Sequence, residues 1–554
     1  MKKTVCNLKK VLVFLNISKK SVLLLIFLGV VTSLASSFLP TINGLIVNNI
    51  LKLSYSKIIL LATIGGLIQI INTLFTYLMN RKYFIIRKDF IVRIRKKLCF
   101  SLINYKSDVY DNEGTGVLLN KVKNDSRLIA NFLNDIKDGL IGLILNLTVI
   151  LYIFYLNYYI GFYYLIVIFF SILIRYFGVK KSLKYQKISI MESDLNDNNL
   201  SEIINGEKDI KINNLKDKLL KKNSLELNKV SYNLFKSNSK SELYISIAKL
   251  IESIFSGFMV IFSVFLIKNN LLSVGNFIII FMYKGSVFLF PSRFGVLISS
   301  LGKFNISCDR VFSVIDNSLE SYGHTDTTIY GDIEFKDVCF HYENGNKIFD
   351  KLNLKIKKNS YCVLLGRNGS GKTTILNLIA KILDPVSGKI FIDNYDINDL
   401  SENTLRCNIA YISQQPYLFN FSILDNLLLV NDDRNKIIEV CKLTGIHDKI
   451  MSFNNGYDTI IGTDACKLSG GEKQKLAIAR ALLTGAKILL FDEITNNLDK
   501  ESIDSIEKII DLLKGKYTII MITHGRVLSS PDNVFKINNY KLVEDKGIDF
   551  KGQT

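Results

Sequence analysis

The sequence predicts an α-helical membrane domain with six spanning helices, followed by a soluble α/β domain. Three observations support this prediction: long uncharged stretches in the first half, basic residues confined to alternate connections, and short strand-like runs alternating with helical patterns after Gly331. At 554 residues the chain is long enough for two or three domains. We expect a transmembrane domain over residues 1–318, a polar linker over 319–330 and the soluble domain over 331–554.

The first four spans follow from three apolar runs. A helix needs ~20 residues to cross a bilayer, and the runs Ser21–Leu51 and Ile58–Asn80 contain no charged residue. The uncharged run Gly139–Ile174 is long enough for a hairpin of two spans that turns near Leu156–Tyr159.

The last two spans are the runs Ser253–Ile267 and Leu271–Pro291, and the second of them contains Lys284. An intramembrane charge costs ~2.5–3.5 kcal/mol on insertion scales, so Lys284 should face protein or water. It either meets an anionic group on a cargo or faces a polar cavity wall. Lys249 and Glu252 lie one helical turn apart and are expected to pair near the inner surface. The expected helices are approximately 21–50, 58–80, 138–157, 159–178, 245–268 and 271–300.

Basic residues predict the orientation of these spans. Lys and Arg gather before the first span and in the long connections Arg81–Lys137 and Arg175–Lys240. The alternate connections contain only Lys52, Lys57 and Lys268. The positive-inside rule therefore places both termini, the long loops and the soluble domain in the cytoplasm of a multi-pass cell-membrane protein in contact with lipid.

Charge and cysteine content argue against two other classes. The net charge of +20 would suit a nucleic-acid partner only if basic residues shared one face with stacking aromatics. Here the lysines flank apolar runs instead, so we expect no nucleic-acid partner. The eight cysteines form no C-x-x-C pair and no metal-ligand spacing with the four histidines, which indicates reduced or buried thiols.

The stretch "GRNGSGKT" predicts a phosphate-binding loop. The motif Gly366-x-x-x-x-Gly371-Lys372-Thr373 follows the apolar strand "YCVLL" and opens the helical pattern "TTILNLIAKIL", the context that this motif requires. Glycines let backbone N–H groups converge on phosphate oxygens, and the helix N-terminus adds partial positive charge. Lys372 would contact the β- and γ-phosphates, and Thr373 would hold Mg²⁺. The nucleotide-binding residues expected here are Gly366, Arg367, Asn368, Gly369, Ser370, Gly371, Lys372, Thr373 and Thr374.

The stretch "KILLFDE" supplies the acidic half of the same site. Its four apolar residues predict a buried strand, and the strand ends in Asp492 and Glu493. Asp492 would reach Mg²⁺ through water, and Glu493 would polarise the attacking water. A strand that ends in two acidic residues is weak evidence alone, but beside a phosphate loop it is specific.

A second anion site is indicated by "LSGGEKQKLAIARAL". Ser469, two glycines and an amphipathic helix form another helix N-terminus suited to an anion. One phosphate loop already serves one nucleotide, so the alternative is an ordinary capped helix start.

The motifs taken together resemble one family. "GRNGSGKT", "LSGGEKQ", "ILLFDE" and "ITHG", in this order and spacing, look like the nucleotide-binding domain of ATP-binding cassette (ABC) proteins. "YDNEGTGVLLNKVKNDSRLI" (residues 110–129) resembles the first cytoplasmic loop of ABC exporters, and "DRVFSVID" (residues 309–316) resembles their exit from the sixth helix. The resemblance covers almost the whole chain and implies a half-transporter in which permease and ATPase are fused.

The resemblance implies roles for further residues. Two such domains pack head to tail, so the signature of one chain would cover the γ-phosphate held by its partner; the signature residues are Leu468, Ser469, Gly470, Gly471 and Glu472. Tyr342 matches the aromatic that stacks on adenine, Gln414 the glutamine that touches Mg²⁺, and His524 the switch histidine that contacts the γ-phosphate. ATP and Mg²⁺ are the expected cofactors. The expected catalytic residues are Glu493, His524 and Gln414, and the expected magnesium ligands are Thr373, Gln414 and Asp492.

Three departures from the family pattern bear on how tightly hydrolysis is coupled to the membrane domain. Glu472 stands where Gln is commonest, Asn496 and Asn497 replace the usual Ser-Ala of the following loop, and Thr463 replaces a usual Glu. Glu493 is intact, so the chain resembles a hydrolytically competent half.

We therefore expect an exporter that moves a peptide, lipid or drug by alternating access in a dimer with a second copy or a different half-transporter. Its cytoplasmic loops should contact the ATPase domains near Asp108–Glu113 and Asn205–Asp209, and the short segment before the first span leaves no room for a fused peptidase. The alternatives are an ATP-gated channel or a non-transporting regulatory protein of this fold. A nucleic-acid mechanoenzyme is disfavoured by the six spans, and an importer is disfavoured because importers usually keep the two parts on separate chains.

Overall fold

The structure is a computed structural model that describes residues 2–15, 18–51, 54–105, 114–316, 320–342, 347–462, 467–523, 527–538 and 541–544. It divides the chain into two compact units, Met1–Leu319 and Glu320–Thr554. The second unit begins within the segment expected to be a linker, where Thr325 forms a parallel bridge with Leu400.

The first unit is helical, and among its described residues six helices are long and apolar enough to cross a membrane, as the sequence predicted. These six are α2 (Lys19–Leu51), α3 (Tyr55–Ile103), α6 (Ser126–Leu156), α7 (Tyr158–Asn205), α9 (Lys216–Lys268) and α10 (Val274–Ile315). The remaining elements are α1 (Lys2–Leu15), α5 (Thr115–Asn120), the π-helical η1 (Lys121–Asp125) and α8 (Glu207–Ile212).

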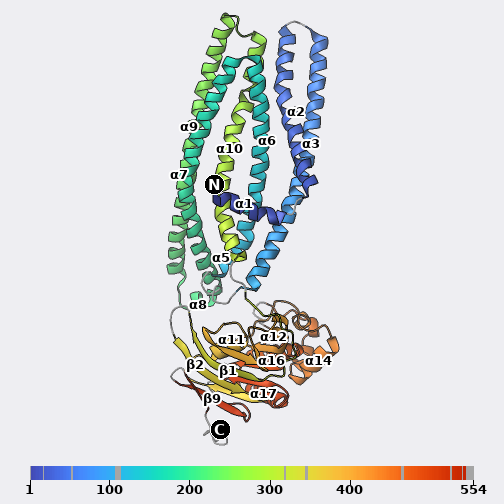
Figure 1. The fold of residues 1–554 in the computed structure, drawn as a ribbon, viewed down its shortest axis with the longest axis vertical. Helices are drawn as coiled ribbons and strands as arrows, with labels where there is room; N and C mark the ends of the chain where they lie inside the picture. Colours follow the sequence, from blue (N-terminus) through green and yellow to red (C-terminus); the bar gives the residue numbers. More distant parts are fainter. Residues whose placement is uncertain are drawn as a thin grey trace. The chain divides into compact units, whose positions relative to one another are not determined.

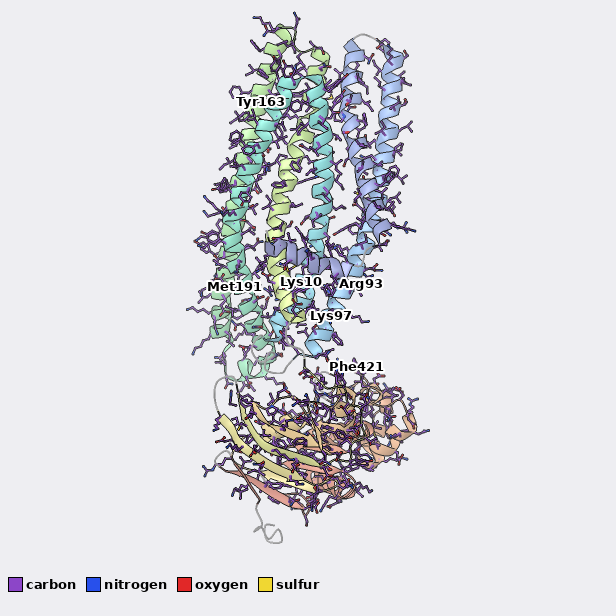
Figure 2. The ribbon with its side chains drawn as sticks, viewed as in Figure 1. Lys10, Arg93, Lys97, Tyr163, Met191 and Phe421 are labelled. Atoms are coloured by element: carbon purple, nitrogen blue, oxygen red, sulfur yellow. The ribbon has the colours of Figure 1, made fainter. Side chains whose placement is uncertain are left out.

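Three of the spanning helices extend far beyond the apolar runs that predicted them. α3, α7 and α9 have 49, 48 and 53 residues, and at 1.5 Å per residue such a helix is ~70–80 Å long, more than twice the hydrocarbon core. The added turns are rich in basic residues, and Figure 2 shows Arg93 and Lys97 toward the end of the unit opposite Tyr163. The short helix α8 lies at the predicted contact segment Asn205–Asp209, whereas Asp108–Glu113 lies outside the described residues.

The helices form two antiparallel pairs with two further helices between them. α2 packs on α3 and α7 packs on α9, while α10 contacts α6, α7 and α2 (Figure 1). The turn predicted near residues 156–159 consists of Asn157 alone, between the end of α6 and the start of α7. Its side chain accepts a hydrogen bond from Ile160 N at 3.2 Å and donates one to Leu271 O at 3.0 Å. One amide therefore caps α7 and also ties this turn to the next hairpin.

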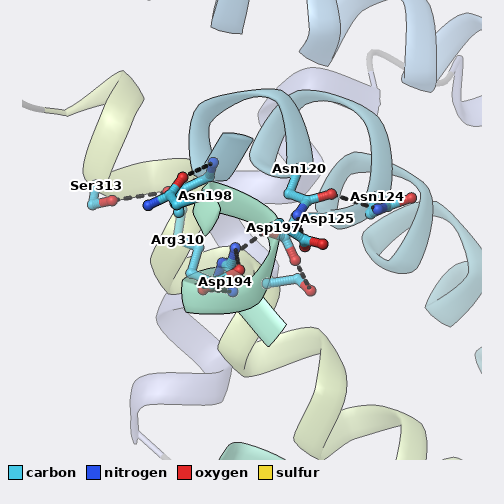
Figure 3. A network of polar contacts seen from close by, with 10 residues as sticks. Asn120, Asn124, Asp125, Asp194, Asp197, Asn198, Arg310 and Ser313 are labelled. Carbon is cyan, nitrogen blue, oxygen red and sulfur yellow. Dashed lines mark hydrogen bonds and ion pairs between the residues drawn. The ribbon is translucent and has the colours of Figure 1, made fainter. Parts of the chain in front are cut away.

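A partly buried ionic network holds together α7, α10 and the start of α6 (Figure 3). Arg310 on α10 binds Asp194 on α7 through two nitrogens, at 2.6 and 2.8 Å. Its Nε lies 2.8 Å from the Asp125 carboxylate, and Ser307 donates a hydrogen bond to the same carboxylate at 2.8 Å. A guanidinium that is shared by two carboxylates fixes the relative rotation of three helices.

A second buried ion pair corrects an expectation from the sequence. Glu252 on α9 accepts a hydrogen bond from Arg175 Nη2 on α7 at 2.9 Å and another from Ser171, whereas Lys249 is exposed. The predicted pairing of Lys249 with Glu252 is therefore wrong, because Glu252 lies on the face of α9 that packs against α7. Lys284 on α10 is half-buried.

The part of the second unit that the structure describes contains two sheets. A six-stranded sheet has the order β10-β9-β3-β8-β7-β6, parallel except at β10, and a four-stranded antiparallel sheet has the order β2-β1-β4-β5. The strands are β1 (Ile333–His341), β2 (Lys347–Ile356), β3 (Tyr361–Leu365), β4 (Ser387–Ile392), β5 (Tyr395–Asp396), β6 (Ile409–Ile412), β7 (Ile488–Asp492), β8 (Thr518–Ile522), β9 (Asn533–Asn538) and β10 (Lys541–Glu544). The helical elements are α11 (Lys372–Ile379), α12 (Glu402–Asn408), α13 (Ile423–Leu428), α14 (Arg434–Leu443), α15 (His447–Met451), η2 (Gly456–Asp458), α16 (Gly470–Leu483) and α17 (Lys500–Leu513).

The alternation of side chains along the parallel strands builds two cores. On β3, Cys362 and Leu364 face a cluster that contains α11 and the antiparallel sheet, while Tyr361 and Val363 face a cluster with α16 and α17. Both faces are covered, which explains why these strands read as continuous apolar runs. A third cluster joins α13–α16, so α16 connects the sheet to a separate helical layer.

Candidate nucleotide site

The phosphate loop joins β3 to α11 at the carboxyl edge of the parallel sheet, where ligands bind in sheets of this kind. Gly369 and Gly371 have φ values of +77° and +99°, a region in which a Cβ is strained. A Cβ on Gly371 would also lie 2.5 Å from the Ile348 side chain. The Ser370 hydroxyl is buried without a hydrogen-bond partner among the described residues. A concave backbone with an unsatisfied polar atom is suited to a ligand rich in acceptor oxygens.

Lys372 is folded over this loop. Its ammonium donates to the carbonyls of Gly366 at 3.0 Å and Arg367 at 3.1 Å, and the residue is 5% exposed. Burial lowers the pKa of Lys372, and the nearby Glu493 and Asp492 oppose that shift. An anion in the loop would compensate this buried charge more fully than two carbonyls do.

Thr373 and Asp492, predicted separately as magnesium ligands, lie together. Thr373 Oγ1 donates to Asp492 Oδ1 at 3.2 Å, and the Tyr411 hydroxyl donates to Oδ2 at 2.7 Å. Burial raises the pKa of Asp492, although these two hydrogen bonds lower it. Among the described residues there is no cluster of three or more His, Cys, Asp or Glu side chains that could hold a metal. The arrangement fits Mg²⁺, which is usually held by few carboxylates together with substrate phosphates.

Gln414, the third predicted magnesium residue, follows β6. Its backbone carbonyl accepts a hydrogen bond from Gln474 Nε2 at 2.8 Å, and Ser413 O accepts from the same nitrogen at 3.3 Å. Gln474 belongs to α16, so the buried amide of the signature helix fixes the backbone of the Gln414 segment.

Glu493 follows β7 with a φ of +51°, and its backbone N–H donates to Ile522 O at 3.1 Å. Its Oε2 accepts a hydrogen bond from Asn496 Nδ2 at 2.6 Å. Asn496, which the sequence showed only as a departure from the family pattern, therefore orients the carboxylate expected to act as base. The signal available in the sequence was an amide donor three residues after the acid, within the same turn. Asn497, the other departure, occupies the left-handed region with a φ of +60°, which asparagine tolerates.

Tyr342 lies beside the phosphate-loop helix. Its hydroxyl forms a hydrogen bond with Thr374 Oγ1 at 3.1 Å, and its ring packs edge-on against Phe340 with centroids 5.1 Å apart. The ring is half-buried. His524 and Thr463 lie outside the described residues.

The signature forms a capped helix N-terminus. Ser469 Oγ accepts from Glu472 N at 3.3 Å, while Glu472 Oε2 accepts from Ser469 N at 2.7 Å, which is a capping box. Lys449 lies 3.2 Å from the other Glu472 oxygen. These contacts explain how Glu is accommodated at position 472. Burial alone would raise the pKa of Glu472, but the hydrogen bonds to Ser469 and Lys449 outweigh burial and lower it.

The signature and the phosphate loop belong to different parts of the unit. Leu468 is buried in the helical layer of α13–α16, whereas α11 packs in the cluster with the antiparallel sheet. Ser469 and Gly470 are exposed. The other predicted signature residue, Gly471, is buried, and a Cβ there would lie 2.3 Å from Ser502 Oγ on α17.

Comparisons with known proteins agree with both units. Residues 22–292 match the family model of the ABC transporter transmembrane region, and residues 349–496 match the ABC transporter family model. The chain is 29% identical over 539 residues to ABC transporter B family member 1 of Dictyostelium discoideum, covering 94% of this chain and 58% of that protein. It is 35% identical over 286 residues to the alpha-hemolysin translocation ATP-binding protein HlyB of Escherichia coli, covering 50% of this chain and 40% of that protein.

A third relative is an uncharacterized ABC transporter ATP-binding protein of Sinorhizobium fredii, 39% identical over 217 residues, which are 39% of this chain and 37% of that protein. The chain thus spans between 37% and 58% of the length of these three relatives. Among solved structures, a bacterial Atm1-family ABC exporter with ATP bound has the same fold, with a TM-score of 0.82 and 21% identity, covering 97% of this chain and 95% of that one.

Proposed function

Because this chain belongs to the ABC transporter family and joins a transmembrane region to an ATPase domain as a half-transporter, we propose that it exports an amphipathic substrate at the expense of ATP. The supporting observation is that one multi-pass chain combines six spanning helices with a phosphate loop that lies against the Asp492 carboxylate. The active form is a dimer, with a second copy or a different half-transporter as partner. The cargo is a peptide, a lipid or a drug.

The roles of the residues follow from their placement. Mg²⁺, when bound with ATP, neutralises charge that develops on the phosphoryl group. Lys372 contacts the β- and γ-phosphates, and Thr373 and Asp492 hold the ion. Glu493 accepts a proton from the water whose oxygen attacks the γ-phosphorus, while the bond from that phosphorus to the bridging oxygen breaks.

The remaining site residues position the nucleotide and the reacting water. Asn496 donates to Glu493 and so restricts its rotamer, and Tyr342 stacks on adenine. Gln414 contacts the ion from the segment that the signature helix holds in place. His524 is assigned to the γ-phosphate by its place in the motif order.

The signature acts on the partner's nucleotide. Its exposed helix N-terminus carries partial positive charge and belongs to a different layer from the phosphate loop of the same chain. Closure of two such units around ATP would turn the membrane helices outward, and hydrolysis would reset them. The distribution of lysine and arginine favours a cytoplasmic location for both termini and for the ATPase domain.

Proteoliposomes distinguish export from the alternatives. We expect some members of a panel of peptides, lipids and drugs to stimulate ATP hydrolysis, and the same compounds to accumulate in inside-out vesicles only with ATP. The Glu493→Gln variant, which replaces the carboxylate by a neutral amide of the same shape, controls for leakage. ATP-dependent current steps without accumulation of any compound would instead identify a channel.

A further inference from the structure

The membrane unit contains a cavity of about 620 Å³, to which the proposed nucleotide site in the other unit assigns no role. Its walls come from α3, α6, α7, α9 and α10. Each wall lies near the cytoplasmic end of a predicted span. Tyr83 and Arg87 follow the span 58–80, Asp135 precedes the span 138–157, and Lys303 follows the span 271–300. The cavity is thus placed at the level of the inner membrane surface.

Positive charge predominates in this cavity. Arg87, Arg175 and Lys303 line it, against a single lining acid, Asp135. Behind the wall, Glu252 takes up part of the charge of Arg175 through one nitrogen. A positive cavity near a membrane concentrates anions, because its low-dielectric walls screen charge poorly.

Arg175 has donors left over after it binds Glu252. The residue is 3% exposed, yet its Nε and Nη1 are buried without a hydrogen-bond acceptor among the described residues. A guanidinium carries five N–H donors, and each one left unsatisfied in a buried place is costly. Gly295 on α10 allows the close approach here, since a Cβ on it would lie 3.3 Å from Arg175 Cδ.

Arg87 on α3, in the other antiparallel pair, also has a buried nitrogen without a hydrogen-bond acceptor among the described residues. Its Nη2 donates to Asn131 Oδ1 at 2.7 Å, while its Nε is buried without a partner among the described residues. Both arginines line the same cavity, and both keep guanidinium nitrogens without an acceptor among the described residues. Planar donor pairs of this kind match the oxygens of carboxylates and phosphates.

The rest of the lining is mixed. Phe84, Phe132, Val179 and Ile245 supply an apolar part. Asparagine and serine side chains supply a neutral polar part: Asn131, Asn134, Ser241, Ser292, Ser299 and Ser300. The volume lies within the ~300–1,000 Å³ usual for small-molecule sites. We propose that this cavity binds an amphipathic molecule with one carboxylate or phosphate group, which contacts Arg87 and Arg175 while the apolar body lies against the aromatic wall. The inference rests on the proposed export function and names the class of its cargo.

Direct binding tests the cavity independently of ATP. The chain contains no tryptophan, so Phe84→Trp introduces a single reporter in the wall. The full-length variant, in nanodiscs of neutral phosphatidylcholine, is titrated with an ω-bromo fatty acid, its methyl ester and the amine of equal chain length. We expect saturable quenching by the acid at a concentration ~10-fold or more below that of the ester, the scale of a hydrogen bond to a charged group, and the weakest quenching by the amine.

Charge-removal variants locate the anion. Arg87→Gln should weaken binding of the acid ~10-fold and leave the ester unchanged. Lys88→Gln is the matched control, because Lys88 is the next residue of α3, does not line the cavity and has a side chain 73% exposed. Replacing Arg175 alone would strand Glu252, so Arg175→Gln is combined with Glu252→Gln, and the pair should weaken binding of the acid in the same way.

Equal quenching by acid and ester, or equal effects of Arg87→Gln and Lys88→Gln, would overturn the proposal and leave a water-filled cavity. Competition by phosphatidylglycerol added to the nanodiscs would support the site and identify a bilayer lipid as the source of the anion. Failure of the proposed export function can be told apart from failure of the anion site. If the acid binds but has no effect on ATP hydrolysis, the proposed function is contradicted and the anion site is retained.

Discussion

The two units differ in how they hold buried charge. In the ATPase unit, Lys372, Thr373 and Asp492 meet at one edge of a parallel sheet, where strand–loop–helix connections fix their backbones. In the membrane unit, Arg310 and Arg175 find their carboxylates on other helices, far away in the sequence. Local backbone geometry builds the first kind of site, and the packing of long helices builds the second. Substitutions in the first should therefore act on chemistry, and substitutions in the second on stability or cargo binding.

The largest expected effect concerns Glu493, the proposed general base of the ATPase unit. Glu493→Gln should reduce ATP turnover by ~10²–10⁴-fold, the scale of a lost general base, while nucleotide binding is retained because the amide keeps the shape of the side chain. Steady-state phosphate release and equilibrium ATP binding measure the two quantities. Turnover close to that of the unaltered protein would remove Glu493 from the mechanism.

In the membrane unit, the largest effect should come from Arg310. Arg310→Met breaks a partly buried network and leaves two carboxylates uncompensated. The loss of stability should approach the value of about 3–5 kcal/mol for a fully buried pair, without a direct effect on nucleotide binding. Thermal unfolding in detergent measures it. The control is Lys10→Met, because the Lys10–Asp316 pair is half exposed and worth at most about 1 kcal/mol. Equal losses in both variants would contradict a special role for the network.

A smaller effect on chemistry is expected at Asn496. Asn496→Ala removes the amide that holds Glu493 Oε2, and we expect kcat to fall ~10-fold, as for a lost hydrogen bond to a charged group, with little change in the KM for ATP. Asn497→Gly is the matched variant, since glycine accepts the left-handed backbone at that position. A change in KM alone, or a greater loss from Asn497→Gly, would argue against a positioning role for Asn496.

The smallest expected effect concerns Tyr342. It separates the proposed stacking of the ring on adenine from the hydrogen bond of the hydroxyl to Thr374. Tyr342→Leu should weaken ATP binding ~5-fold or more, near the lower end of the ~1–3 kcal/mol that base–aromatic stacking provides. Tyr342→Phe loses only the hydrogen bond to Thr374 and should bind nearly as the unaltered protein does. Titration with a fluorescent ATP analogue measures both. If Tyr342→Phe is the weaker binder, the hydroxyl rather than the ring matters.

The same contrast explains what could be predicted from the sequence. The six spans and the meeting of Thr373 with Asp492 followed from apolar length and from a strand–loop–helix pattern, both of which are local. The partner of Glu252 could not be found in this way, because helix packing and not sequence spacing decides which face of α9 lies against α7 and so brings Glu252 to Arg175. The contact of Asn496 with Glu493 was also missed, since it depends on the left-handed backbone at Glu493. Side-chain partners across a helical bundle are decided by tertiary packing, and partners at left-handed turns are decided by backbone conformation. Local sequence patterns do not predict either.

The central claim is that the nucleotide site is composite, with the phosphate loop of one copy covered by the signature of another. Complementation tests it with two variants, Lys372→Ala, which removes the loop lysine, and Ser469→Arg, which blocks the signature. Each alone should have almost no ATPase activity. A mixed dimer purified through two tags would contain one site with both defects and one intact site.

We predict that this mixed dimer regains ATP hydrolysis, whereas a dimer of an unaltered copy with a copy carrying both substitutions does not, because both of its sites are damaged. A mixed dimer as inactive as its parents, or equal activity in the two arrangements, would contradict the composite site.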